Sequence, residues 1–195
     1  MVFFTADTHF DHANIIRLCD RPYETVQQMN EDLIVRWNRK VTGNDTIYIL
    51  GDMFFRSSDP EAILRRLHGK KHLIVGNHDT WLKHVDVDRY FKEVSYYTTT
   101  TDGQHGLVLC HYPQVCWAHA QRFYMVHGHI HANTSADYFP LLAGNKRTLN
   151  AGVDINNFEP VTFEELLENN TRFKAQYTRC VDTQPQEVPP FSSAT

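Results

Sequence analysis

Short apolar runs that end in polar side chains recur along the chain. The first run covers residues 2–6 and is followed by Asp7, Thr8 and His9. A short apolar run bounded by polar residues is typical of a buried strand, so the pattern predicts a strand that delivers polar side chains at its C-terminal end. The other runs of this kind, each again followed by polar residues, are residues 46–50, 73–75, 107–110 and 123–126.

Helical spacing separates several of these runs. Apolar residues recur three or four positions apart over residues 26–41, which makes one apolar stripe and predicts a packing helix. A shorter helix is expected over residues 60–67, because an aspartate that can cap it precedes a proline suited to the first helical position. Thr162 and Glu165 form a capping-box pattern, which predicts a last helix ending near residue 168.

The order of these elements predicts a fold class. Strands alternate with helices early in the chain, and closely spaced strands follow over residues 92–153, which predicts layered sheets flanked by helices in an α/β fold. With 195 residues and 42% hydrophobic content, the chain can bury one sizeable core, so we expect a single domain over residues 1–181. Residues 182–195 are rich in Pro, Ser, Thr and Gln and are expected to form a flexible tail.

Composition narrows the environment and the partners. A formal net charge of -4 gives no global field for gripping a long polyanion. The four cysteines lack paired zinc-type spacing and are too few for a disulfide framework, which favours reduced thiols in the cytoplasm. The N-terminus lacks a basic leader and no apolar stretch approaches a membrane span, so we expect a soluble cytoplasmic protein with no membrane partner. The sequence does not indicate an oligomeric state.

Ligand-type side chains gather at the ends of the predicted strands. Asp7 and His9 lie two residues apart, so in an extended segment both point to the same side and one metal ion could take both. His129 and His131 repeat this spacing. Each motif alone is common by chance, but their coincidence at successive strand ends favours a metal site over a structural role. A carboxylate that can bridge ions, a neutral carbonyl oxygen and a further imidazole come from Asp52, Asn77 and His111.

Taken together, the motifs resemble those of the calcineurin-like metallophosphoesterases. That family has the pattern Asp-x-His, Gly-Asp, Gly-Asn-His-Asp/Glu, His and Gly-His-x-His. Residues 152–166 also resemble the small bacterial and phage members of the family. In this chain the family pattern is carried by Asp7-Thr8-His9, Gly51-Asp52, Gly76-Asn77-His78-Asp79, His111 and Gly128-His129-Ile130-His131.

The resemblance implies a two-metal centre and a fold. The implied fold is a four-layer αββα sandwich of two mixed sheets flanked by helices, the metallo-dependent phosphatase fold. Two ions held in this way can activate a bridging hydroxide as the nucleophile. The oxygen and nitrogen ligands favour Mn²⁺, with Fe, Zn and Ni as alternatives. One ion is implied on Asp7, His9, Asp52 and His131, and the other on Asp52, Asn77, His111 and His129.

Further residues are implied to act on the substrate. In the family, the histidine at the position of His78 contacts the phosphate and protonates the leaving group, and Asp79 could raise its pKa and fix its orientation. The alternative is that His78 only supports the metal ligands. His12, Arg17 and Arg56 are additional candidates for substrate binding, and a solvated surface role is equally open for each.

Three functions remain open from the sequence. The preferred one is hydrolysis of phosphodiesters, with nucleotides or nucleic-acid ends as the substrate class. The second is hydrolysis of phosphomonoesters or phosphoproteins by the same centre. The third is a non-catalytic scaffold that binds a partner, and the complete ligand set argues against it because buried charge is costly to retain without a role.

Overall fold

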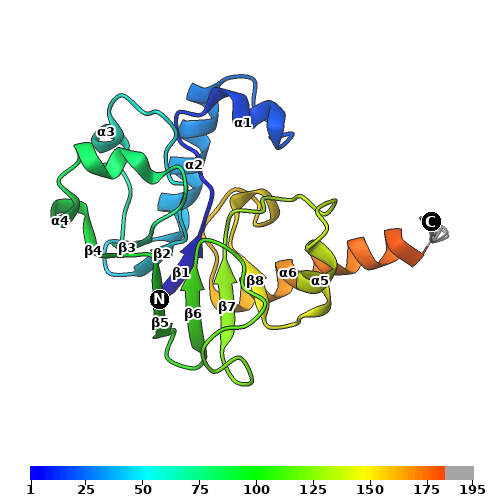
Figure 1. The fold of residues 1–195 in the computed structure, drawn as a ribbon. Coiled ribbons are helices and arrows are strands. Elements are labelled where there is room, and N and C mark those ends of the chain that lie inside the picture. The colour runs from blue at the N-terminus through cyan, green and yellow to red at the C-terminus, as the bar shows by residue number, and fades with distance from the viewer. Residues whose placement is uncertain (183–195) are drawn as a thin grey trace, which may run out of the picture.

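Two four-stranded sheets lie against each other in the computed structural model, which describes residues 1–182, and helices flank them (Figure 1). The first sheet has the strand order β1-β2-β3-β4 and the second has the order β5-β6-β7-β8. The strands are β1 (Val2–Thr5), β2 (Thr46–Ile49), β3 (Lys70–Ile74), β4 (Phe91–Ser95), β5 (Tyr97–Thr101), β6 (Gly106–Cys110), β7 (Tyr124–His127) and β8 (Thr148–Asn150). The expected sandwich of two sheets between helices is therefore confirmed.

Strand direction differs from the expectation in one sheet. All neighbouring strands of the first sheet run parallel, so this sheet is not mixed. The second sheet is mixed, because β5 and β6 are antiparallel whereas β6, β7 and β8 are parallel. Parallel neighbours need a crossover connection, and helices lie in the connections between the strands of the first sheet. The consequence is that the first sheet presents all its carboxyl ends at one edge.

Six α-helices and two 3-10 turns complete the described chain. The long helix α2 is capped by the Thr25 side chain, which accepts a hydrogen bond from the Gln28 amide and so satisfies one of the free amides of the first turn. Asp59 likewise caps α3 through the Ala62 amide, although α3 ends earlier than predicted. The elements are α1 (Ala13–Leu18), α2 (Val26–Lys40), α3 (Pro60–Leu64), η1 (Asp79–His84), α4 (Val87–Tyr90), α5 (Phe139–Gly144), η2 (Val153–Ile155) and α6 (Phe163–Asp182).

The last helix begins as predicted and ends later. The Thr162 amide donates to the Glu165 carboxylate at 2.9 Å and the Glu165 amide donates to the Thr162 hydroxyl at 3.4 Å, which is a capping box. The expected end near residue 168 is wrong, because α6 continues to Asp182. Phe173 packs against a separate apolar cluster around α5, and this packing stabilises the later turns of the helix. Apart from residue 182, the predicted tail lies outside the described residues.

Alternating side chains of the strands build the two main cores. Phe3 and Ile47 face α2, where they pack with Trp37. Their neighbours along the strands face the other way, so Phe4 packs with Leu107 of the second sheet. The first core continues past the carboxyl ends of the strands through Phe10, Met53 and Phe54, so the loops that carry the predicted ligands are anchored in it.

Two further observations concern the described part of the chain as a whole. None of its helices has both the length and the apolar character that a membrane crossing requires. Cys19, Cys110 and Cys116 are free thiols.

Candidate metal centre

The loops after β1 and β2 run side by side in an unusual backbone conformation. Asp7, His9 and Asp52 have φ angles of 55°, 49° and 53°. This left-handed region is uncommon for residues other than glycine, although Asp and His occupy it more often than most. The loops are held together because the Asp7 amide donates to the Gly51 carbonyl and the His9 amide to the Asp52 carbonyl, both at 3.0 Å. Each turn thereby aims its polar side chain at the same region.

The loop after β7 joins this arrangement from the second sheet. His129 and His131 have φ angles of 72° and 50°, so they repeat the left-handed conformation. The His129 amide donates to the Asp7 carboxylate at 2.9 and 3.1 Å. The site is therefore tied together across the two sheets by one of its own candidate ligands.

Glycines allow the loops to approach this closely. A Cβ atom on Gly76 would lie 2.3 Å from Oδ1 of Asp52, and one on Gly51 would lie 2.4 Å from Nδ1 of His111. Real Cβ atoms do not come so near, so these glycines, which precede Asn77 and Asp52, are required for close approach of the backbone to candidate ligands.

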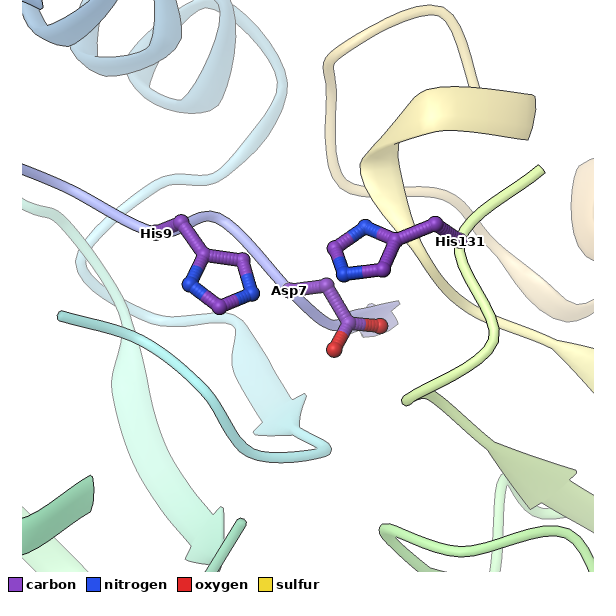
Figure 2. Close-up of side chains that lie close together, drawn as sticks. All are labelled: Asp7, His9 and His131. Atoms are coloured by element: carbon purple, nitrogen blue, oxygen red, sulfur yellow. The ribbon is translucent and has the colours of Figure 1, made fainter. Parts of the chain in front are cut away.

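One cluster of metal-ligand type is formed by Asp7, His9 and His131, whose ligand atoms lie within 4.8 Å of one another. Figure 2 shows the three side chains turned toward a common space, two from the loop after β1 and one from the loop after β7. His9 is buried, yet neither of its ring nitrogens has a hydrogen-bond partner within residues 1–182. A buried polar atom without a partner is costly, and an ion bound by this ring would remove the cost.

A second cluster contains Asp52, His111 and His129, again within 4.8 Å of one another. Nε2 of His111 lies 3.5 Å from Oδ2 of Asp52. Oδ1 of Asn77 lies 3.0 Å from Nε2 of His111 and 3.1 Å from Nδ1 of His129, so the amide oxygen belongs to this cluster. Oδ2 of Asp52 is also 3.8 Å from Nε2 of His9. The Asp52 carboxylate therefore lies between the two clusters.

The electrostatics of the site favour added positive charge. Burial raises the pKa of Asp7 to about 7 and lowers the pKa of His9 to about 2. Burial also acts to lower the pKa of His111, but its hydrogen bond to Asp52 and the charge of Asp7 outweigh burial and raise this pKa to about 9. The pKa of His131 rises to about 10 because its hydrogen bond to Asp154 opposes the effect of burial. Without metal, protons on the His111 and His131 rings, whose pKa values are raised, would compensate the buried carboxylates.

Asp154 and Arg21 belong to the site, although no sequence pattern assigned either residue a role. Nδ1 of His131 lies 2.7 Å from Oδ2 of Asp154, and Nε of Arg21 donates to Oδ1 of Asp154 at 2.8 Å. Arg21 also donates to the backbone carbonyl of Asp7 at 2.7 Å. A carboxylate that fixes the far nitrogen of a metal-binding histidine orients the ring toward the ion. The resemblance over residues 152–166 included Asp154, but no motif pointed to Arg21.

His78 lies beside the clusters, and its expected pairing with Asp79 is not found. Nε2 of His78 is 4.0 Å from Oδ2 of Asp52, and its ring touches the Phe55 ring at a centroid distance of 5.1 Å. The Asp79 carboxylate instead accepts hydrogen bonds from the backbone amides of Asp52, Met53 and Gly76 and from the Trp81 indole. Those donors use its lone pairs, so Asp79 fixes the loop that carries Asp52 rather than the His78 ring.

A cavity of about 700 Å³ opens over the clusters and separates the remaining candidates. His12 lines it and stacks on Phe55 with a centroid distance of 3.9 Å. Arg56 does not line the cavity and lies over the Phe55 ring at 5.3 Å. Arg17 is an exposed residue of α1 and does not line the cavity either. Of these three candidates, only His12 is placed to meet a ligand in the cavity.

Comparison with known proteins gives relatives across most of the chain. The uncharacterized protein MJ1445 of Methanocaldococcus jannaschii is 30% identical, over 86% of this chain and 89% of its own length. The Gene 66 protein of Mycobacterium phage D29 is 27% identical, over 78% of this chain and 87% of its own. The solved structure of AQ665, a protein of unknown function from Aquifex aeolicus, has a TM-score of 0.68 at 25% identity, over 86% of this chain and 98% of its own.

A family model classifies the chain. The model of the calcineurin-like phosphoesterases matches residues 1–182, which is all of the chain that the structure describes. The match includes every loop that carries a candidate ligand, together with the stretch around Asp154. This chain therefore belongs to the calcineurin-like phosphoesterase family.

Proposed function

We propose that this protein hydrolyses phosphate esters, preferably diesters of the nucleotide or nucleic-acid-end type, with two divalent metal ions. The observation that carries the proposal is the pair of ligand clusters with the Asp52 carboxylate between them. One ion would be held by Asp7, His9, Asp52 and His131, and the other by Asp52, Asn77, His111 and His129. Family membership supports a phosphoesterase, and the two clusters support a second ion.

The residues present fit such ions. Carboxylate, amide and imidazole groups without a thiolate suit Mn²⁺, which we prefer, and also suit Fe, Zn or Ni. The unpartnered nitrogens of His9 and the buried Asp7 carboxylate both gain from a bound cation. When bound, two ions would supply an activated water and neutralise charge on the phosphate. Cytoplasmic localisation remains part of the proposal.

His78 is the residue that we assign to proton transfer. Its side chain is 41% exposed, so it can meet a substrate, and it lines the cavity next to Asp52. The His78 amide donates to Oδ1 of Asp52 at 2.8 Å, which fixes the backbone from which the ring projects. The Phe55 ring then limits where the imidazole can turn. A histidine held there can place a proton on the leaving oxygen of the ester.

The charges around the cavity support a diester. In the part of the chain that the structure describes, no lysine or arginine lines the cavity. A phosphomonoester carries more negative charge than a diester and would depend more on fixed cations. The polar side chains of the lining are those of histidines and asparagines, together with Asp52, Cys19 and Tyr138. This arrangement favours the monoanionic diester.

The test is whether the loss of turnover caused by His78→Ala depends on the leaving group of the ester. Metal content should stay near normal, while turnover of an alkyl diester should fall by roughly 10²- to 10⁴-fold, as is typical of lost acid catalysis. The loss should be smaller for a nitrophenyl diester, because its leaving oxygen needs little protonation. His84→Ala is the matched control, since His84 is exposed and does not line the cavity.

Several results would contradict parts of the proposal. Equal slowing of both diesters would make His78 a phosphate-positioning residue, and loss of metal would make it a ligand. A higher kcat/KM for nitrophenyl phosphate than for its diester would establish the monoesterase alternative. Absence of turnover with Mn²⁺, Fe, Zn²⁺ or Ni²⁺ in an intact, metal-loaded protein would favour the scaffold.

A further inference from the structure

The cavity over the metal clusters has an apolar part that the proposed chemistry does not use. Leu18 at the end of α1 and Tyr138 just before α5 both line it, and Ile15, Ile130 and Ala132 are further apolar residues of the lining. Leu18 is 65% exposed and Tyr138 is 43% exposed. The same cavity thus combines ligand-type side chains with large apolar side chains that face solvent.

Packing does not account for Leu18 and Tyr138. Ile15 and Ile130 are buried and belong to apolar cores, so their presence in the lining follows from the fold. Leu18 and Tyr138 belong to none of the core clusters formed by residues 1–182. Exposed apolar side chains that gather at a cavity mark a binding surface more often than those scattered singly over a protein.

The size of the cavity leaves room for more than a phosphate group. A volume of about 700 Å³ falls within the range of pockets that bury a whole small organic ligand. A phosphate at the metal clusters would fill one part of it. The remaining space is bounded by the apolar side chains and by Asn133, which also lines the cavity.

We infer that Leu18 and Tyr138 form a subsite for a planar aromatic substituent of a phosphodiester, such as the base of a nucleoside ester. The inference rests on the proposed function, because the phosphate must lie at the metal clusters for its substituent to reach this wall. A phenol ring offers a face on which a base can stack, and Leu18 offers an apolar surface in the same cavity. Selection among esters then lies in this wall and the chemistry lies in the metal clusters.

The experiment compares two esters with the same leaving group. One is the p-nitrophenyl ester of thymidine 5′-monophosphate and the other is methyl p-nitrophenyl phosphate, so only the retained substituent differs. Tyr138→Ala should lower kcat/KM for the nucleoside ester by roughly 5- to 100-fold, the range found for loss of a base-stacking side chain. The methyl ester should change less than about twofold in that variant, because stacking is not available to it.

Two variants test whether the effect requires the aromatic ring of Tyr138 and a position in the cavity lining. Tyr138→Phe keeps the ring and should retain the preference for the nucleoside ester. Leu141→Ala removes another exposed side chain of the same region, because Leu141 lies on α5, is 61% exposed and does not line the cavity. This variant should behave like the wild type. Thermal unfolding of each variant verifies that it is folded.

A binding measurement separates the two proposals. Calorimetry with the metal-loaded protein should show tighter binding of thymidine 5′-monophosphate than of methyl phosphate, and Tyr138→Ala should remove the difference. Selective binding without hydrolysis of either ester would overturn the proposed function and keep the subsite. Hydrolysis or binding that Tyr138→Ala leaves unchanged for the nucleoside compound would overturn the subsite, as would an equal loss for both esters.

Discussion

The two ligand clusters are each braced by a buried carboxylate, but in different ways. Asp154 braces the first cluster through His131 and is itself paired with Arg21. Asp79 braces the second by accepting hydrogen bonds from three backbone amides and an indole, and no lysine, arginine or histidine within residues 1–182 forms an ion pair with it. The first brace acts on a ligand side chain, whereas the second acts on the backbone of a ligand loop.

Asp154 therefore controls the orientation of a ligand side chain, whereas Asp79 controls the backbone conformation of a ligand loop. The Asp154–Arg21 pair holds the His131 ring and so sets the direction of one metal–nitrogen bond. Loss of the pair should therefore weaken the binding of one ion. The backbone amides that donate to Asp79 fix the conformation of the chain around Asp52 and Gly76. Loss of the Asp79 carboxylate should therefore lower the free energy of unfolding. Substitutions at the shared ligand and at each brace test whether the two clusters are independent.

Asp52→Asn should have the largest effect, because it changes a carboxylate that lies between the two clusters. We expect the affinity for both ions to fall by more than the roughly 10- to 100-fold that is typical for loss of a residue that only supports a ligand. Turnover should fall with metal content. Metal analysis after dialysis against limiting Mn²⁺ measures this, and a variant with near-normal turnover would remove Asp52 from the bridging role.

Asp154→Asn should have an intermediate effect and should distinguish the clusters. The ion of the first cluster should bind roughly 10- to 100-fold more weakly, because His131 loses the carboxylate that orients it. The ion of the second cluster should keep its affinity. Calorimetric titration or anomalous scattering at limiting metal resolves the two occupancies. Asp88→Asn, at an exposed position of α4, is the control, and equal weakening of both ions would show that the clusters are not independent.

Asp79→Asn should act mainly on stability. The amide brings hydrogen-bond donors where the backbone already supplies them, so we expect the free energy of unfolding to fall by about 1 to 3 kcal/mol. Urea unfolding of the metal-free protein at neutral pH measures this. An unchanged midpoint would mean that the hydrogen bonds to Asp79 add nothing to the fold.

The smallest expected effect is an opposite response of the two braces to acid. Burial raises the pKa of Asp79 above its usual 3.8, so its folded form holds a proton more tightly than its unfolded form. Burial acts in the same direction on Asp154, but its contacts with His131 and Arg21 prevail and lower its pKa below 3.8. The stability that Asp154 contributes is present above pH 3.8 and is lost as the pH falls toward the lowered value.

The measurement is the difference in unfolding free energy between the wild type and each asparagine variant across the acid range. The advantage of the wild type over Asp79→Asn should grow as the pH falls through the raised pKa toward 3.8, because protonation removes the cost of the buried charge. Its advantage over Asp154→Asn should shrink below that pH. Parallel curves for the two variants would contradict the assigned directions of the pKa shifts.

Much of the fold followed from periodicity, since the strand over residues 46–50 and the helix over residues 26–41 were both found where expected. Both depend on local apolar spacing. The length of α6 did not follow, because its later turns are stabilised by Phe173 packing on Phe139, a contact between distant parts of the sequence. The direction of the strands also depends on connections that local patterns do not describe.

The candidate site likewise contains residues that sequence motifs predicted and residues whose roles only the folded chain shows. The positions of His129 and Asp52 in spaced motifs led to the clusters that the structure brings together. The roles of Arg21 and Asp79 could not be read from the sequence, because each acts through hydrogen bonds to residues that only the folded chain places beside it. Arg56 suggested a phosphate contact by its charge and its place after Gly-Asp, but its guanidinium lies over an aromatic ring instead.

The left-handed backbone lowers the stability of the fold at positions whose side chains the proposed function requires. These positions are Asp7, His9, Asp52, His129 and His131. For an L-residue this conformation can cost up to about 1 to 2 kcal/mol, and glycine would adopt it freely. Metal binding to the folded chain would offset this cost. A screen for thermostability carried out without metal should therefore enrich glycine or asparagine at these positions, and the most stable chains that it returns should be inactive.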